Sequence, residues 1–394
     1  MIKKHTIFQL ILYCYIIFIC LVSVWLYQLS ILSIGLAIIV FPLWLIRRKN
    51  KDSVPIFYLF LFILVWAFFT TMYHDYGVPK RFIVMPIVFA FITMLIPFAF
   101  SKLTANNSID YKKHLFYVSF IITACTGLYS LYFYATTLQF VRLNSPLGGA
   151  AVLHVVLLLT LTVYLANLKV GFRKIPSAIL VVITLSMIVL TGSRAGLVTT
   201  ILLLLSVVIT KKNIIRSVAL LLFLVVIGYF IFQFLPTDRF GDMSDSIRST
   251  SYKTSWYMAT QSIETIIAGN GYGTVWPWYA FYSKFLSLNS PFFHTPFGDV
   301  LFHPHSIFFG LFTELGLIGL IPFLIIIFII VKHFFKNVRK GNAFNSVILY
   351  GILCSLPAFA LDYYLFHNNK ISIIWWYFVF SAVSATNRNE KEEA

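Results

Sequence analysis

Three polar side chains stand at the ends of apolar segments: Arg194, Arg248 and His305. An arginine guanidinium offers two parallel donors that match the oxygens of a phosphate, so two of them near a membrane surface could hold a diphosphate. A neutral imidazole accepts a proton near pH 7. These residue types predict a site that binds a diphosphate and removes a proton. Plainer interpretations also stand, since Arg194 could snorkel to lipid headgroups and Arg248 could be solvated.

His305 belongs to the run His303-Pro304-His305-Ser306, which comes just before a long apolar segment. Two residues at i and i+2 do not share a helix face, so at most one histidine should face a given cavity. We expect that residue to be His305, the deeper and more securely helical of the two. A metal site is not expected, because no nearby carboxylate or cysteine completes a ligand set. Glu314, on the other side of the same helix, is expected to be a structural partner inside the bundle.

The elements that must position these groups are membrane helices. Of the 394 residues, 60% are apolar and 11% are charged, whereas about one quarter of the residues in soluble domains are charged. Apolar runs of about 20 residues recur along the chain, and each is long enough to cross a bilayer as a helix. The net charge of +17 comes from basic residues between these runs. We therefore expect it to reflect membrane topology and not binding to nucleic acid.

The apolar runs predict an all-α, polytopic integral membrane protein with about twelve transmembrane helices. A polar turn from Thr191 to Ala195 divides the seventh span from the eighth, because one helix across it would have about 36 residues, more than a bilayer needs. The expected spans are 6–27, 31–46, 54–73, 82–100, 114–135, 148–167, 175–191, 195–210, 215–235, 304–331, 344–362 and 371–386.

Basic residues decide the orientation of these spans. If both termini lie in the cytoplasm, every cytoplasmic loop carries at least three basic residues, as the positive-inside rule requires. Joining the two spans around Arg194 would reverse the later loops and spoil this pattern. Nine of the 30 Lys and Arg then face outward, which leaves 21 for the cytoplasmic side. The nine are Lys80, Arg81, Arg142, Arg194, Arg239, Arg248, Lys253, Lys284 and Lys370.

One connection between spans is long, Pro236 to Phe302, and this topology places it outside. Long loops usually carry function. Within it, the apolar spacing from Tyr252 to Ile267 predicts an amphipathic helix that lies at the membrane interface. The chain is thus expected to have three parts: 1–235 with membrane helices 1 to 9, 236–302 as the outward loop, and 303–394 with helices 10 to 12 and a short cytoplasmic tail.

Three segments resemble, in order, motifs of the O-antigen ligase and polymerase superfamily of integral membrane glycosyltransferases. They are TGSRAG at 191–196, the pattern from Arg248 to Trp256 followed by GNGYG at 269–273, and HPHSIFFGLFTELGLIGL at 303–320. The last is the most specific, since the family has a histidine followed by Asn or Ser and then an acidic-glycine-aliphatic-glycine helix. Ser306 takes the place often held by Asn. The span layout and the late large loop extend the resemblance over most of the chain.

The resemblance implies a GT-C-like fold in the bacterial inner (cytoplasmic) membrane, with an active site that faces the periplasm. It implies an undecaprenyl-diphosphate-linked glycan as donor and no metal or other cofactor. By motif, Arg194 and Arg248 resemble the family's two diphosphate-contacting arginines, and His305 resembles its essential histidine. The segment that begins at Arg142 resembles, less firmly, a polar segment of the family that enters a middle span. The positions expected to bind substrate are Arg142, Ser306, Tyr252 and His303.

The acceptor separates the two activities of this superfamily. A ligase of lipopolysaccharide biosynthesis transfers the glycan to lipid A-core, whereas a polymerase transfers it to another lipid-linked glycan. Chain length and the position of the large loop resemble the ligases slightly more. A transporter or flippase of lipid-linked glycan is the alternative from another class. It would be expected to carry charged residues along a central pathway, but here the notable polar groups cluster toward one face.

The topology predicts that a cysteine placed at Ser283 reacts with a membrane-impermeant thiol reagent added to the periplasmic side. The chain's own cysteines, Cys14, Cys20, Cys125 and Cys354, lie inside apolar runs and should react slowly. Labelling of position 283 only from the cytoplasmic side would contradict the predicted orientation.

Overall fold

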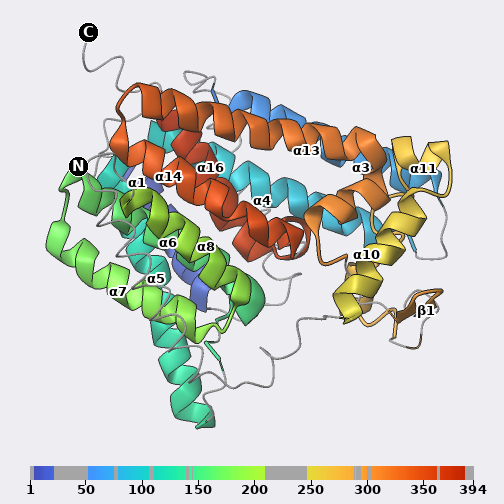
Figure 1. Cartoon of the computed structure of the whole chain (residues 1–394), viewed down its shortest axis with the longest axis horizontal. Helices are drawn as coiled ribbons and strands as arrows, with labels where there is room; N and C mark the ends of the chain where they lie inside the picture. The colour runs from blue at the N-terminus through green and yellow to red at the C-terminus, as the bar shows by residue number, and fades with distance from the viewer. Residues whose placement is uncertain are drawn as a thin grey trace. The chain divides into compact units, whose positions relative to one another are not determined.

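The structure is a computed structural model that describes residues 4–21, 52–74, 79–105, 111–138, 142–143, 145–208, 246–287, 289, 294–299, 304–361 and 364–386. Its regular elements are almost all helices (Figure 1). The helices are α1 (Lys4–Leu21), α3 (Val54–Tyr73), α4 (Arg81–Ala105), α5 (Tyr111–Thr137), α6 (Ala150–Val170), α7 (Lys174–Leu190), α8 (Arg194–Val208), α10 (Ser246–Ala259), α11 (Ile263–Ala268), α12 (Trp278–Tyr282), α13 (Ile307–Arg339), α14 (Ala343–Cys354), the 3-10 helix η3 (Leu356–Ala360), α15 (Tyr364–His367) and α16 (Asn369–Ala385). The strands β1 (His294–Thr295) and β2 (Gly298–Asp299) form an antiparallel hairpin.

The all-α membrane fold is confirmed. Among the described residues, six helices are long and apolar enough to cross a membrane, and three shorter apolar helices accompany them. The expected span 54–73 coincides with α3, and the spans expected at 175–191 and 195–210 correspond to α7 and α8. The spans expected at 31–46 and 215–235 lie outside the described residues. The count of twelve therefore stays a prediction.

The polar turn between α7 and α8 is confirmed as a break between two helices. Gly192 lies in the left-handed region at φ +60°, where a glycine is favoured because it has no Cβ. Ser193 then starts α8, since its Oγ accepts a hydrogen bond from the Gly196 backbone at 3.2 Å. The turn thus ends one helix and caps the next within three residues.

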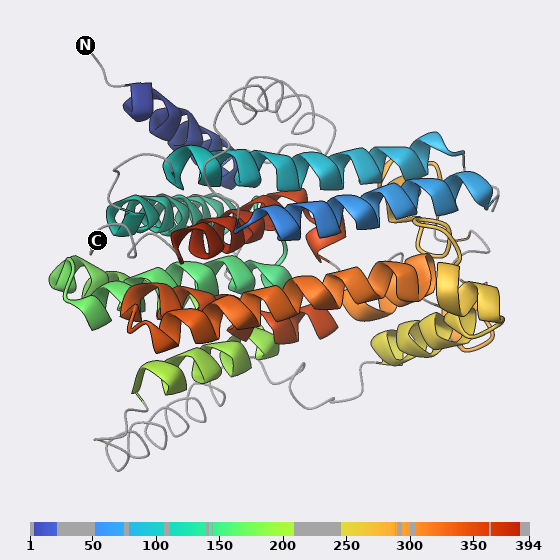
Figure 2. The same ribbon diagram turned by 90° about the horizontal axis from the view of Figure 1, so that it is seen from above.

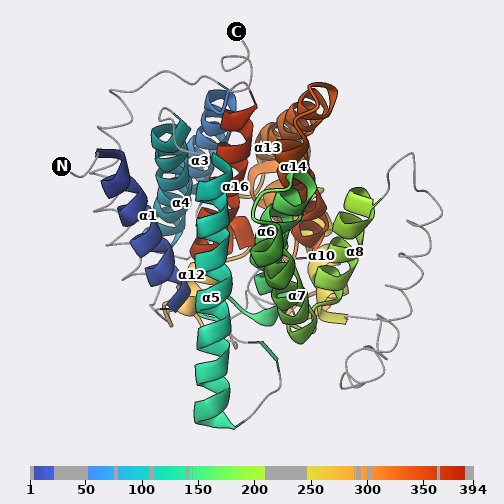
Figure 3. The same ribbon diagram turned by 90° about the vertical axis from the view of Figure 1, so that its left-hand side faces the viewer.

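Chain contacts divide the protein into two compact units, one of which consists of α1, α5 to α8 and α14. Its central helix is α6, and α5, α7, α8 and α14 all contact it (Figure 3). Every side chain of α6 from Val152 to Asn167 is buried. Gly351 of α14 lies so close to Thr162 of α6 that an added Cβ would overlap the threonine side chain. A helix that is apolar on all sides is thereby buried by helices on all sides.

The second unit includes α3, α4, α10 to α12, the hairpin, α13 as far as His333, α15 and α16. All 17 residues of α16 are buried, and this helix packs chiefly against α4. Figure 2 shows α3 and α4 side by side in the same unit. Aromatic rings fill the space between the helices, with Phe60 and Trp376 at 4.8 Å and Phe98 and Phe380 at 5.2 Å between centroids.

The interfacial segment differs from the single helix expected between Tyr252 and Ile267. It begins earlier, at Ser246, and forms two helices, α10 and α11, separated by Thr260–Ser262 (Figure 1). The break follows from a capping box: Ser262 Oγ accepts from the Thr265 backbone at 3.1 Å, and Thr265 Oγ1 accepts from the Ser262 backbone at 3.0 Å. Apolar spacing alone could not reveal this local capping.

The tenth expected span, 304–331, is also not one continuous helix. Gly316 interrupts α13 with φ +61° and ψ −160°. The end of α11 fits into this interruption: a Cβ on Gly269 would overlap the Glu314 carbonyl group, and a Cβ on Gly316 would overlap the Ile267 carbonyl group. Two backbones therefore meet at a distance that only glycines allow.

Hydrogen bonds from other segments satisfy the carbonyl groups freed by this break. Thr313 O accepts from the Asn270 backbone at 3.0 Å and from Asn270 Nδ2 at 2.9 Å. Glu314 O accepts from the Gly271 backbone at 2.9 Å, and Trp66 Nε1 donates to Leu315 O at 3.1 Å. Since an unpaired carbonyl at membrane depth costs several kcal/mol, non-helical backbone persists there only with such partners.

Replacing either Gly269 or Gly316 by alanine should lower the melting temperature of the purified protein in detergent by several degrees. The alanine adds a Cβ overlap and a left-handed non-glycine residue, which together cost on the order of 3 kcal/mol. The matched control is Gly127→Ala on α5, where an added Cβ meets nothing within 4 Å. Melting temperatures of Gly269→Ala and Gly316→Ala equal to that of the control would contradict the close backbone contact.

Candidate functional site

His305 lies in a sharp turn directly before α13 and is not helical, so the expected helical position is wrong. Its φ is +54°, a conformation that few non-glycine residues adopt, although histidine is among the more tolerant ones. The side chain is only 8% exposed. Strained backbone of this kind costs about 1 to 3 kcal/mol and persists where the surroundings impose it, often at functional sites. His303 lies outside the described residues.

Ser306 caps α13. Its Oγ accepts from the Phe309 backbone at 3.4 Å, and its carbonyl oxygen accepts from the Gly310 backbone at 2.9 Å. Asn and Ser are both strong N-cap residues because each has a short side chain with an acceptor oxygen. Serine in a position often held by asparagine therefore keeps the capping contact that starts the helix. The structure gives Ser306 this local role next to His305.

Tyr252 connects α10 to the turn that holds His305. Its hydroxyl donates to Ala360 O at 2.8 Å and lies 3.4 Å from His305 O. Its ring stacks on Phe309 of α13, with centroids 5.0 Å apart and planes at 24°. Arg248 precedes Tyr252 by four residues, so both side chains lie on one face of α10. The structure thus places Arg248, Tyr252, His305 and Ser306 on connected elements of one unit.

In the other unit, Arg194 belongs to the TGSRAG turn, and Arg142 packs against the same turn. Arg142 packs against Gly192, where an added Cβ would lie 3.4 Å from its Nε, and Leu143 N donates to Leu190 O at 2.9 Å. The Arg194 side chain is exposed at the first residue of α8. Two guanidinium groups and the N-terminus of α8 all bring positive charge to this turn. Such an arrangement can bind an anion.

His154 of α6 contacts this turn. A lone histidine in an apolar segment is typical of a packing residue, so the sequence did not indicate this contact. His154 Nδ1 lies 3.0 Å from Ser193 Oγ, and both side chains are buried. A Cβ on Gly196 would come within 2.7 Å of the His154 Cβ. The small residues of the TGSRAG motif therefore make room for a histidine that hydrogen-bonds to the turn.

Glu314 has the structural role expected of it. The side chain is 1% exposed, and its Oε1 accepts from the Gly273 backbone at 2.8 Å. Tyr272, next to that contact, is fully buried, and burial together with the nearby Glu314 carboxylate raises the pKa of its phenol well above the usual value. The phenol is therefore neutral at physiological pH. The GNGYG motif and the acidic residue of the last motif form a single packed junction.

The sequence also did not indicate that Lys370 is buried. The topology placed it among the nine outward cations, but in α16 its side chain is only 7% exposed. A buried lysine signals a specific local environment, which sequence spacing does not show. Among the described residues, no group of three or more His, Cys, Asp or Glu side chains could hold a metal ion.

The fold is that of a multi-pass helical membrane protein. One unit carries two arginines beside the start of α8, and the other carries Arg248 near the start of α10 and a strained His305 before α13. Residues 179–324 match the family model described as O-antigen ligase, which confirms the resemblance to the O-antigen ligase and polymerase superfamily. The matched segment contains Arg194, Arg248, Tyr252 and His305, whereas Arg142 lies before it. No curated protein sequence gives a significant match to the chain.

Proposed function

We propose that this protein is an O-antigen ligase that transfers an undecaprenyl-diphosphate-linked polysaccharide to lipid A-core at the periplasmic face of the inner membrane. The family match supports an enzyme that acts on lipid-linked glycans. The observation that carries the proposal is His305, held buried in a left-handed turn inside the matched segment. A histidine fixed in this way is suited to proton transfer, because its direction is set before the substrate arrives.

In the proposed mechanism, Arg194 and Arg248 hold the donor's diphosphate. The diphosphate is anchored to the membrane by its polyprenyl chain, so it lies close to the ends of the membrane helices. As the bond between the anomeric carbon and the diphosphate oxygen breaks, the electron pair leaves with the diphosphate. The guanidinium groups stabilise this growing negative charge. Arg142, packed beside the turn that carries Arg194, is proposed to add to the same field.

His305 is the proposed general base. The acceptor hydroxyl attacks the anomeric carbon from the side opposite the diphosphate, and His305 takes the hydroxyl proton as the new glycosidic bond forms. Attack from that side inverts the configuration of the carbon and leaves no covalent enzyme intermediate. The mechanism uses no metal, because the arginines supply the positive charge. Ser306 and Tyr252 are proposed to position the histidine through the turn, with His303 near the acceptor.

His305→Ala should reduce transfer by about a hundredfold to ten-thousandfold, the usual cost of losing a general base. Arg194→Lys should also be severely impaired, because a point charge does not reproduce the bidentate fork. His303→Ala should be milder. These rates would be measured on purified protein with lipid-linked donor, acceptor and a chelator, and product anomers would be read by NMR.

The control for these rates is His294→Ala, which removes an exposed histidine from β1 and should leave transfer unchanged. Size-exclusion chromatography would establish that each variant is folded. Full activity of folded His305→Ala, or retention of anomeric configuration, would overturn the mechanism.

A polymerase that joins lipid-linked repeat units is the second candidate, since the superfamily that the motifs resemble includes both activities. Deleting the gene should leave long lipid-linked polymer and bare lipid A-core if the protein is a ligase. Core carrying a single repeat after deletion would instead identify a polymerase. A gel of lipopolysaccharide from the deletion strain and from a complemented strain distinguishes the two activities. If the glycan on the core is unchanged after deletion, both proposals are refuted.

A further inference from the structure

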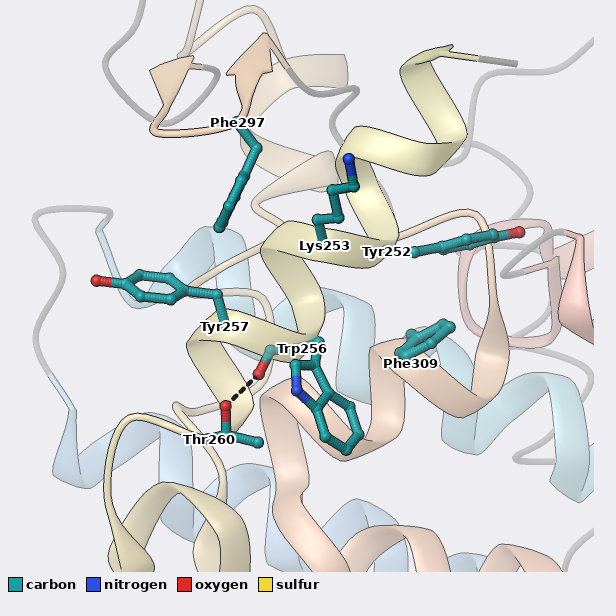
Figure 4. Close-up of a pocket in the computed structure, with 7 residues that line it drawn as sticks. All are labelled: Tyr252, Lys253, Trp256, Tyr257, Thr260, Phe297 and Phe309. Carbon is teal, nitrogen blue, oxygen red and sulfur yellow. Dashed lines mark hydrogen bonds between the residues drawn. The ribbon is translucent and has the colours of Figure 1, made fainter. Parts of the chain in front are cut away.

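A shallow hollow of about 430 Å³ opens along one side of α10, within the same unit as His305. Figure 4 shows its walls: α10 supplies most of the side chains, the hairpin contributes one ring from above, and the start of α13 contributes another. Five of the seven residues that line it are aromatic, and the other two are a lysine and a threonine. The lining residues that matter here are Tyr252, Lys253, Trp256, Tyr257, Phe297 and Phe309.

The chemistry of this lining matches a sugar better than a lipid chain. A pyranose ring has a face of C–H bonds, which carry partial positive charge, and an edge of hydroxyl groups. The C–H face stacks on the negative face of an aromatic ring, while an ammonium such as that of Lys253 can donate to the hydroxyl groups of the edge. A pocket for acyl or polyprenyl chains could be lined by Leu or Ile as well as by aromatic side chains. Every apolar residue of this lining is aromatic, which favours a sugar ring as the ligand.

Two of the rings are well exposed, and contacts between α10 and the hairpin hold one of them in place. Trp256 is 59% exposed, and Phe297 is 43% exposed. Phe297 meets Tyr257 edge to face at 5.7 Å, and a hydrogen bond of 3.2 Å between Thr254 and Thr295 holds the hairpin against α10. A surface arranged before its ligand arrives loses little conformational entropy when it binds.

The position of the hollow indicates which sugar it would meet. Arg248 lies four residues before Tyr252 and eight before Trp256, which is about 6 Å and 12 Å along the helix axis. The first sugars of the donor are joined directly to the diphosphate that Arg248 is proposed to hold. We propose that this aromatic hollow is a glycan subsite that binds the donor sugars nearest the diphosphate. This inference rests on the proposed function for its choice of glycan.

The test uses full-length protein in nanodiscs and a probe without lipid or phosphate: the repeat-unit oligosaccharide released from the lipid-linked donor by mild acid. Saturation-transfer NMR should show binding to the wild type and at least a tenfold loss of affinity in Trp256→Ala. Phe297→Ala, on the hairpin, gives a second variant that leaves the helices unchanged. The matched control is Tyr73→Ala, which removes a tyrosine that is 78% exposed at the end of α3 and should bind as the wild type does.

A second measurement separates the hollow from a membrane anchor made of the same rings. A spin label at position 257 should be accessible to a water-soluble relaxation agent, whereas a label buried in lipid would respond to oxygen and overturn the subsite. Equal oligosaccharide binding in Trp256→Ala, Phe297→Ala and wild type would also overturn it. Transfer by the wild-type protein is assayed separately, so a chain that binds the oligosaccharide but transfers nothing refutes the proposed function and leaves the subsite standing.

Discussion

The contact between Gly269 and Gly316 fixes much of the second unit, because it brings the backbone of a loop into a broken membrane helix. The break frees three consecutive carbonyl groups of α13, and the loop and α3 supply donors to all of them. This exchange keeps polar backbone satisfied where water is scarce. The same junction also holds α10, because Thr313 Oγ1 donates to Ser255 O and Asn270 Nδ2 donates to Met258 O, both at 3.1 Å. Arg248 and Tyr252 then take their places along that helix.

The family motifs thus contain two kinds of residue with different physical roles. Glycines and small side chains, such as Gly196 beside His154, let segments approach closely enough to change direction. Arginine and histidine side chains stand at those changes of direction, near the ends of helices. A charge in this place costs far less than one in the middle of a span, yet it can still face a lipid-anchored substrate. The packing residues therefore determine where the chemical groups can act.

Tyr252 links the proposed chemistry to the proposed recognition of sugar. Its hydroxyl group contacts the carbonyl oxygens near His305, and its ring stacks on Phe309 and lines the aromatic hollow. One side chain can do this because a phenol has a polar end and an apolar face. The face of α10 changes in the same order, from the guanidinium of Arg248 to the indole of Trp256. That order matches the proposed donor, which passes from an anionic diphosphate to sugar rings.

The sequence by itself determined the elements that depend on local composition. Apolar runs gave the boundaries of helices such as α3, the TGSRAG turn separated α7 from α8, and residue types identified Arg194, Arg248 and His305 as candidates. The tertiary structure decided features that depend on distant partners: the break at Gly316, the left-handed turn at His305 and the hydrogen bond between His154 and Ser193. Hydrophobic periodicity is a property of neighbouring residues, whereas these features need donors or space from segments far along the chain.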